Sequence, residues 1–249
     1  MTRHEQYERD GFIPCIDMLT AEETAQLRVD FDALEADMGK EVSQIGIISR
    51  EHELEFLWRL ATHPKILDAV VSVYGEDLLM IGTHVFCKYS AEAVGKAAYV
   101  AWHQDVTYWG LRPPKAISVW LAIDDVDEEN GAMLVIPCTH TQAYEHGKSD
   151  DDENLLSVNQ AIDDGALDVD TAVPIILKAG QLSLHDGLLV HGSRPNHSGR
   201  RRAGLTIRYT TPDVVPVPDS NKRVDWQPVL VHGEDRYGNW SLKPAPVFN

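Results

Sequence analysis

This sequence of 249 residues contains few cysteines, no long apolar run and no excess of basic residues. Its three cysteines, Cys15, Cys87 and Cys138, are odd in number and widely spaced, so they indicate neither a disulfide framework nor a CxxC metal site. A reducing, cytoplasmic location is therefore expected. The N-terminus leads into no apolar segment, and no stretch of about 18 apolar residues occurs, so we expect neither a signal peptide nor a membrane span.

The sequence also has fewer basic than acidic residues. The chain has 22 basic and 39 acidic residues and a formal net charge of −17. A field of that sign repels polyanions, so nucleic acid and anionic membranes are not expected partners. Hydrophobic residues make up 43% and charged residues 24%, which is typical of a globular protein. We expect a single domain over residues 1–249, and no feature of the sequence indicates an oligomeric state.

The first third of the chain, residues 1–77, is predicted to be helical. Thr20 and Glu23 have the spacing of a capping box, which marks the start of a helix. A second helix is predicted from Pro64 to Tyr74, with proline in its first turn and Gly75 as its stop. The apolar residues of the first helix recur at helical spacing, at Leu27, Phe31, Leu34 and Met38.

Residues 78–231 are instead predicted to form a β core. Short runs rich in β-formers alternate with glycine, proline, asparagine and aspartate, without intervening helices, which predicts an antiparallel jelly roll. The fold class is therefore mainly β: a double-stranded β-helix, cupin-like, with the N-terminal helices packed outside. Asp150–Asp170 is an acidic insertion, and we expect it to act as a lid. The predicted strands are Met80–Lys88, Tyr99–Gln104, Ala116–Ile123, Ala132–Ile136, Ala172–Leu177, Gln181–Leu184, Leu188–His191 and Ala203–Thr210.

One of these strands contains the first candidate for chemistry, His103-Gln104-Asp105. Side chains two positions apart on a strand project from the same face, so His103 and Asp105 could occupy adjacent positions on one metal. Such a pair is common by chance and is usually a hydrogen-bonded surface pair; His232 and Glu234 repeat the pattern in this chain.

A downstream histidine gives the pair its context. His191 is predicted to end an apolar strand and precedes a glycine- and proline-containing turn, which would place it at the mouth of a barrel. Two histidines and one carboxylate form the facial triad of non-haem Fe(II) oxygenases, which leaves three coordination positions open. We therefore take His103, Asp105 and His191 as the metal ligands, with His185 as the alternative third ligand.

Two arginines share the polar face of the last long strand. Arg202, Gly204, Thr206 and Arg208 alternate with Ala203, Leu205, Ile207 and Tyr209, so the two sets lie on opposite faces. An interior guanidinium needs an anion, and its planar fork matches a carboxylate. Arg202 is predicted to bind a carboxylate, whereas Arg208 is expected to meet either an acidic side chain or an anionic group of the substrate. The preceding Arg200 and Arg201 are expected to be solvated.

Together these segments resemble the phytanoyl-CoA dioxygenase family of Fe(II)/2-oxoglutarate oxygenases, over most of the chain from Asp10 to Tyr209. Trp102-His103-Gln104-Asp105 is similar to the family's WHQD motif. Asn130-Gly131-Ala132 through Pro137-Cys138-Thr139-His140 resembles its NG…(I/L)PGSH turn, with cysteine and threonine in place of the usual glycine and serine. The third segment resembles the family's HxS…N…S…R motif and comprises His191, Ser193, Asn196, Ser198 and Arg202.

The resemblance implies a reaction and further site residues. Fe(II) would be the metal, and 2-oxoglutarate and O₂ the co-substrates, with Arg202 on the distal carboxylate of 2-oxoglutarate. Lys88, Ser118 and Ser193 are implied to help bind 2-oxoglutarate, and Tyr108 to line the substrate pocket. Halogenating relatives have glycine or alanine at the position of Asp105, so the residue found here implies hydroxylation of a small molecule, or a related oxidation, with release of succinate and CO₂.

Two other functions fit parts of the same sequence. The first is a zinc or manganese isomerase or lyase on a cupin-like barrel, with the same three ligands but no use for Arg202. The second is a non-enzymatic β-sandwich that binds sugars, which leaves the polar face from Arg202 to Arg208 unexplained.

Overall fold

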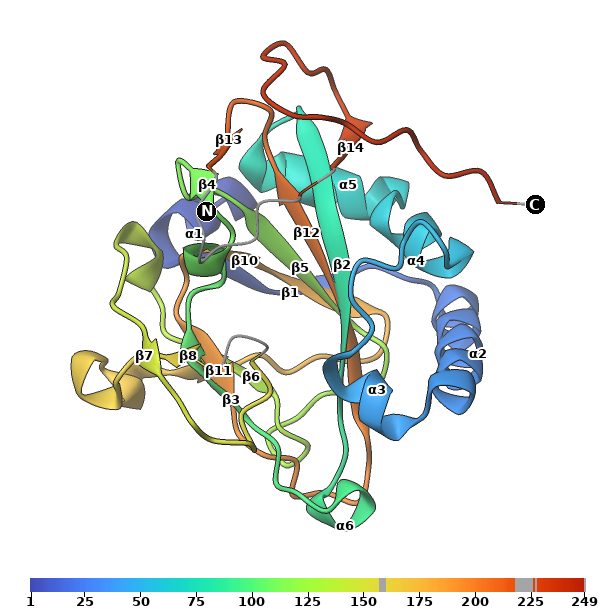
Figure 1. The fold of residues 1–249 in the computed structure, drawn as a ribbon, viewed down its shortest axis with the longest axis vertical. Helices are drawn as coiled ribbons and strands as arrows, with labels where there is room; N and C mark the ends of the chain where they lie inside the picture. Colours follow the sequence, from blue (N-terminus) through green and yellow to red (C-terminus); the bar gives the residue numbers. More distant parts are fainter. Residues whose placement is uncertain (157–159, 218–225, 227, 249) are drawn as a thin grey trace.

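Two antiparallel β-sheets stack against each other in a computed structural model of the chain, which describes residues 1–156, 160–217, 226 and 228–248, without the side chains of Tyr108 and Gln160. The larger sheet has six strands in the order β1-β10-β5-β12-β2-β14 (Figure 1). Its strands are β1 (Phe12–Asp17), β10 (Gln181–Asp186), β5 (Ile117–Ala122), β12 (Arg202–Thr210), β2 (Leu78–Lys88) and β14 (Val229–His232).

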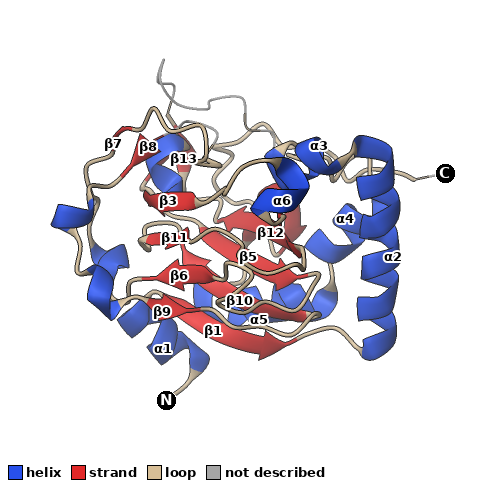
Figure 2. Cartoon of the chain, turned by 90° about the horizontal axis from the view of Figure 1, so that it is seen from below, coloured by secondary structure: helices blue, strands red, loops and turns tan. Residues whose placement is uncertain are grey.

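The smaller sheet covers one face of the larger one (Figure 2). It contains β3 (Val100–His103), β11 (His191–Ser193), β6 (Met133–Val135) and β9 (Val173–Pro174), in that order. Two short pairs lie outside both sheets: β13 (Val215–Pro216) with β4 (Leu111–Arg112), and β7 (Gly147–Lys148) with β8 (Gln160–Ala161). This arrangement is the expected mainly β jelly roll. Among the described residues, no helix is long and apolar enough to cross a membrane.

Helices from the N-terminal part pack on the other face of the large sheet (Figure 1). Both predicted helices are present: α2 begins at Ala21, directly after its N-cap Thr20, with Glu23 completing the capping box inside the helix, and α5 has proline at its start. The α-helices are α1 (Arg3–Asp10), α2 (Ala21–Met38), α3 (Lys40–Ile45), α4 (Glu55–Ala61), α5 (Pro64–Tyr74) and α6 (Ala91–Val94). The 3₁₀ helices are η1 (Asp105–Tyr108), η2 (Thr139–Thr141), η3 (Asp164–Ala166) and η4 (Val169–Thr171).

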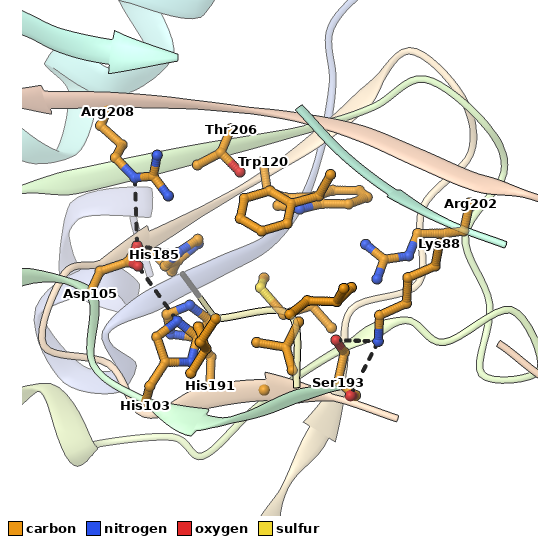
Figure 3. Close-up of a pocket in the computed structure, with 16 residues that line it drawn as sticks. Lys88, His103, Asp105, Trp120, His185, His191, Ser193, Arg202, Thr206 and Arg208 are labelled. Atoms are coloured by element: carbon orange, nitrogen blue, oxygen red, sulfur yellow. Dashed lines mark hydrogen bonds and ion pairs between the residues drawn. The ribbon is translucent and has the colours of Figure 1, made fainter. Parts of the chain in front are cut away.

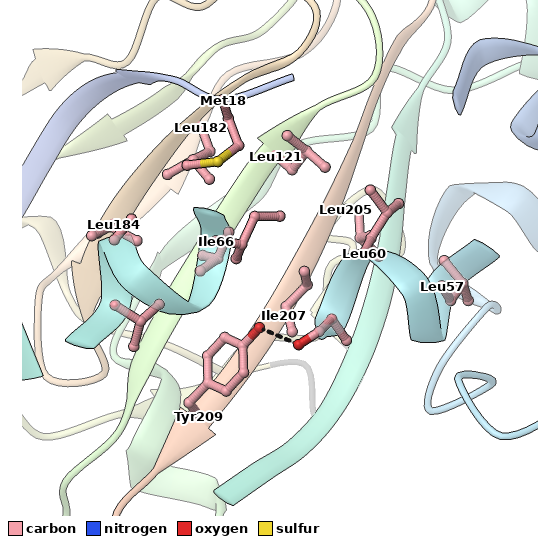
Figure 4. Packing of buried hydrophobic residues seen from close by; sticks show 14 of the residues in the cluster. Met18, Leu57, Leu60, Ile66, Leu121, Leu182, Leu184, Leu205, Ile207 and Tyr209 are labelled. Carbon is pink, nitrogen blue, oxygen red and sulfur yellow. Dashed lines mark hydrogen bonds between the residues drawn. The ribbon is translucent and has the colours of Figure 1, made fainter. Parts of the chain in front are cut away.

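The main hydrophobic core lies between these helices and the large sheet (Figure 4). Strand β12 contributes Ala203, Leu205, Ile207 and Tyr209, all fully buried, as the two-residue alternation predicts. The Tyr209 hydroxyl donates a hydrogen bond to the Ala61 carbonyl at 2.8 Å, which ties the strand to α4. Burial of this face therefore fixes which side of β12 points away from the helices.

The N-terminal part is not purely helical, because β1 belongs to the large sheet. It pairs with β10, so residues 1–77 are continuous with the β core. The strand is short and contains Pro14, which hides it from a periodicity argument. Proline is tolerated there because β1 is an edge strand, and its register is irregular between Ile13 and Ile16.

Two predicted strands are shorter or displaced. The stretch predicted as Ala172–Leu177 forms only the two-residue β9, followed by an isolated bridge between Leu177 and Val126. The stretch predicted as Leu188–His191 is mostly a turn, and His191 begins β11 instead of ending a strand. Asp186 stabilises that turn, since its side chain accepts a hydrogen bond from the Leu188 amide at 2.8 Å. Buried apolar side chains in a turn look like a strand in the sequence.

Candidate active site

A cavity of about 50 Å³ lies between the two sheets, and side chains of both line it (Figure 3). The polar face of β12 forms part of its wall, as the alternation predicts. The lining residues are Phe86, Lys88, Val100, His103, Asp105, Trp120, Met133, Leu155, Leu156, His185, His191, Gly192, Ser193, Arg202, Thr206 and Arg208.

One end of the cavity brings together His103, Asp105 and His191. One ligand atom from each lies within 4.8 Å of the others, and all three residues are buried. His103 ends β3 and is paired directly with His191, the first residue of β11. Asp105 is not on the same strand as His103, because β3 stops and η1 begins at the carboxylate. The side chains of His103 and Asp105 therefore come together because the chain turns between them, and not because they lie on the same face of one strand.

Backbone carbonyls fix the two imidazoles in the form that a metal needs. Nδ1 of His103 lies 2.9 Å from the Ala101 carbonyl, and Nδ1 of His191 lies 2.9 Å from the Leu189 carbonyl. A carbonyl can only accept a hydrogen bond, so each Nδ1 carries the proton and each Nε2 keeps a free lone pair. This is the usual arrangement of metal-binding histidines, and it fits a divalent cation at this position.

The surroundings of His191 and Asp105 also favour the protonation states in which these side chains can bind a cation. Burial and the adjacent His103 keep the pKa of His191 well below its usual value, so this imidazole is neutral. Burial acts to raise the pKa of Asp105, but Arg208, His103 and His185 outweigh it and hold that pKa well below the usual value. A neutral imidazole beside an ionised carboxylate is the donor set that a cation requires.

The other end of the cavity contains two buried cations. Arg202 and Lys88 lie directly opposite each other on β12 and β2, and both side chains are almost fully buried. Burial lowers the pKa of Arg202 to about 10, and burial together with Arg202 keeps the pKa of Lys88 well below its usual value. The Lys88 amine donates to the Ser193 hydroxyl at 2.7 Å, and the Arg202 guanidinium lies over the Trp120 ring, 5.3 Å from its centroid. Among the described residues, no carboxylate forms an ion pair with either side chain.

The turn before β12 uses the remaining residues of the third motif. Asn196 donates to the Lys88 and Arg200 carbonyls, and its own side-chain oxygen accepts from Ser198. These side chains shape the turn that leads into Arg202 and do not line the cavity. Arg200 is solvated, as predicted, but Arg201 is not. Its guanidinium is half-buried among three carboxylates, those of Asp32, Glu35 and Asp124.

Three further residues that the sequence singled out are Ser118, His185 and Tyr108. The Ser118 hydroxyl donates to Oδ2 of Asp105 at 3.2 Å and does not line the cavity, so it contacts the carboxylate and not the space beside Arg202. His185 lines the cavity, but it falls outside the cluster of His103, Asp105 and His191. Tyr108 ends η1, and its side chain lies outside the described part of the structure.

Arg208 projects into the end of the cavity that contains His103, Asp105 and His191 (Figure 3). Its Nε lies 4.0 Å from Oδ2 of Asp105, and its guanidinium lies over the Trp109 ring, 5.1 Å from the centroid. An acidic partner was one of the two expectations for this arginine. No pattern in the sequence indicated that this acid would be the same carboxylate that faces the two histidines.

Apolar residues that the sequence did not single out complete the cavity wall. Phe86 could have been found, since it lies two positions before Lys88 on β2 and shares its face. Leu155 and Leu156 come from the acidic insertion, which contains β8, η3 and the start of η4 and is not a plain loop. No local pattern marks these two leucines. That the insertion acts as a lid stays a prediction, and its residues 157–159 lie outside the described part.

Comparisons with known proteins point the same way as this geometry. The model of the family described as "Phytanoyl-CoA dioxygenase (PhyH)" matches residues 7–204. A probable alpha-ketoglutarate-dependent hypophosphite dioxygenase from Stutzerimonas stutzeri is 24% identical, over 93% of this chain and 85% of its own. Ectoine dioxygenase from Nocardia farcinica is 24% identical, over 82% and 76%.

Solved structures share the fold. The non-heme monooxygenase ThoJ, in its apo form, has a TM-score of 0.78 and 28% identity, covering 98% of this chain and 88% of that one. The epimerase SnoN, solved with Fe³⁺, alpha ketoglutarate and nogalamycin RO, has a TM-score of 0.71 and 22% identity, covering 86% and 84%. The second likeness extends to the fold alone.

Proposed function

This chain belongs to the phytanoyl-CoA dioxygenase family of Fe(II)/2-oxoglutarate-dependent oxygenases, and from that premise we propose that it hydroxylates a small molecule with release of succinate and CO₂. In this proposal His103, Asp105 and His191 hold the iron. The bound iron and 2-oxoglutarate supply the O₂-activating chemistry, and the chain supplies geometry and a site closed to water. We propose a cytoplasmic enzyme, as the three free cysteines suggest.

The observation that carries the proposal is the pair of buried cations, Arg202 and Lys88, at the far end of the same cavity. Like charges directly opposite each other on paired strands destabilise a sheet, and burial makes each of them more costly. An anion between them removes both penalties. The distal carboxylate of 2-oxoglutarate is such an anion, and Ser193 adds a hydroxyl that already accepts a hydrogen bond from Lys88.

The same pair argues against the two alternatives. A zinc or manganese isomerase or lyase needs the three ligands but not a buried cation pair in the same cavity. A sugar-binding module needs neither the ligands nor the cations, because neutral sugars do not offset buried positive charge.

We propose in addition that the substrate carries a negative charge bound by Arg208. This guanidinium reaches the cavity beside Asp105, at the metal end and six residues along β12 from Arg202. A substrate held there would lie next to the metal and away from the 2-oxoglutarate subsite. The relative named for hypophosphite acts on a small anion, which supports this substrate class. Tyr108, adjacent to Trp109 in the chain, stays a predicted pocket residue.

A succinate-release screen across small-molecule classes tests the function. Release should require Fe(II), 2-oxoglutarate and O₂ together, and carboxylates, phosphonates and phosphorus oxyanions should stimulate it more than neutral analogues. Zn(II) in place of Fe(II) is the matched control and should give none. Turnover that proceeds with Zn(II) and without 2-oxoglutarate would indicate a lyase or isomerase.

Arg208→Gln tests the substrate-anion proposal separately. The variant should weaken substrate binding but spare the uncoupled decarboxylation of 2-oxoglutarate. If the variant loses thermal stability while its substrate KM is unchanged, Arg208 has a structural role only.

A further inference from the structure

The two oxygens of the Asp105 carboxylate have different surroundings. Oδ1 lies on the side of the two proposed histidine ligands, 3.5 Å from Nε2 of His103. Oδ2 lies near three potential donors on strands of the large sheet, of which Figure 3 shows His185 and Arg208. The Ser118 hydroxyl donates to Oδ2 at 3.2 Å, Nε2 of His185 lies 3.8 Å away, and Nε of Arg208 lies 4.0 Å away. One oxygen of the carboxylate therefore lies beside the other proposed metal ligands, and the other oxygen lies beside potential hydrogen-bond donors.

His185 is the member of this group that the proposed chemistry does not use. Its side chain is 2% exposed, and neither ring nitrogen has a hydrogen-bond partner among the described residues. It lines the cavity and packs against His191 with 4.8 Å between ring centroids, yet it falls outside the ligand cluster. A buried imidazole without hydrogen bonds is unfavourable, so the presence of His185 at this position calls for an explanation. Oδ2 of Asp105 is the nearby acceptor toward which Nε2 is directed.

The number of open metal positions depends on how Asp105 binds. A carboxylate can coordinate through one oxygen or through both, and the second mode occupies an extra position. A facial triad supports 2-oxoglutarate and O₂ only if the carboxylate takes one position and leaves three. Donors on the outer oxygen favour the one-oxygen mode, since they compete with the metal for its lone pairs.

We propose that His185 and Ser118 are positioning residues that hold Oδ2 of Asp105, so that Oδ1 alone binds the metal. A neutral imidazole with its proton on Nε2 can make this bond, and closing the 3.8 Å separation to hydrogen-bond length needs a shift of about 1 Å. The inference rests on the proposed function in taking Asp105 as a metal ligand, but it concerns which oxygen binds. In strand register, Ser118 and His185 lie directly opposite each other on β5 and β10, so the sheet itself presents both donors to one oxygen.

The test compares Mn(II) affinity in His185→Phe, which keeps an aromatic ring and removes the donor, and in His185→Gln, which restores one. His185→Phe should bind Mn(II) roughly 10–100-fold more weakly, the usual effect of removing an outer partner of a metal ligand. His185→Gln should recover most of that affinity, and Ser118→Ala should lose roughly tenfold. Ser183→Ala is the matched control: Ser183 is buried on the same strand and face, two residues away, and its loss should leave Mn(II) binding unchanged.

A second readout reports the binding mode itself. At saturating Fe(II) without O₂, the visible charge-transfer band that 2-oxoglutarate produces on Fe(II) should require more 2-oxoglutarate in His185→Phe, because a two-oxygen carboxylate blocks a position. A loss of packing alone would not move this titration once the metal site is full. The His185→Gln titration should resemble that of the unmodified protein.

Several outcomes would overturn the inference. Equal Mn(II) affinity in His185→Phe and the unmodified protein would remove His185 from the site, and equal losses in the Phe and Gln variants would leave only a packing role. Complete loss of binding in both would make His185 a ligand. If His185→Phe does not fold, Ser118→Ala decides, and unchanged affinity there contradicts the proposal. Failure of the unmodified protein to bind Mn(II) would instead contradict the proposed metal centre.

Discussion

The six-stranded sheet is buried on both faces, but the two faces are made of different residues. The face toward the helices is apolar, and β12 contributes Leu205, Ile207 and Tyr209 to it. The face toward the small sheet contains Arg202 and Arg208 from the same strand. Apolar burial on the helix face stabilises the folded state. The cavity face instead places charge in a low dielectric, which destabilises it. The helix face therefore stabilises the fold, and the cavity face is retained for chemistry.

This comparison predicts that substitutions on the two faces have separable effects. Asp105→Ala, in the cavity, should have the largest effect, reducing succinate release to the level of the metal-free enzyme because one of the three proposed metal ligands is lost. Circular dichroism should show the fold intact. Asp186→Asn is the control, since this half-buried acid lies outside the ligand cluster. Normal turnover by Asp105→Ala with Fe(II) would make the assignment of the three ligands wrong.

Arg202→Ala should have the second-largest effect on activity. Loss of a buried, charge-assisted contact is worth about 2–5 kcal/mol, so the KM for 2-oxoglutarate should rise roughly 30-fold or more. Arg200→Ala is the matched control, because Arg200 pairs with Asp127 and Glu129 in solvent. Steady-state kinetics in 2-oxoglutarate checks both. Similar increases in the two variants would indicate a diffuse basic patch in place of a specific subsite.

Leu205→Ala breaks the helix face. The free energy of unfolding should fall by about 2–5 kcal/mol, because a fully buried leucine leaves a cavity in the main core. The KM for 2-oxoglutarate should be unchanged in the folded fraction. Denaturant unfolding and kinetics on the same preparation measure the two effects. A large change in KM with little loss of stability would show that the two faces are coupled and not separable.

Gly204→Ala should give the smallest effect and probes the cavity face without removing charge. A methyl group there would lie 2.2 Å from the Trp120 indole, which must shift, and such overpacking is unfavourable by about 1–3 kcal/mol. Because Arg202, the proposed 2-oxoglutarate anchor, lies over that ring, a moderate rise in the 2-oxoglutarate KM should accompany the lost stability. A loss of stability with an unchanged KM would mean that Trp120 packs the wall without supporting Arg202.

Some of the site was predictable from spacing because the spacing is local. The alternation along β12 separates Leu205 from Arg202 in any strand, since successive side chains point to opposite faces. The start of α2 was predictable for a similar reason, because a capping box involves residues three apart. The convergence of His103 and Asp105 was expected, but for the wrong local reason, since β3 ends before the carboxylate.

The contacts of residues whose neighbours come from distant parts of the sequence were predicted less accurately. Ser118 faces Asp105 through the pairing of β5 with β10 and β12, which no short window of sequence contains. Arg201 meets carboxylates from α2 and from the end of β5, so its neighbours come from distant segments. Leu155 reaches the cavity from an insertion without any clear pattern.

The sequence by itself therefore determined the chemical types of the donors, the face on which Arg202 lies and the family to which the chain belongs. Only the tertiary structure decided which of two histidines joins His103 and Asp105. His191 does so because β11 pairs with β3, whereas His185 lies on the opposite sheet, behind the carboxylate. The physical reason is that backbone geometry fixes the spacing of near neighbours, while strand pairing between residues far apart in sequence depends on burial of the whole chain.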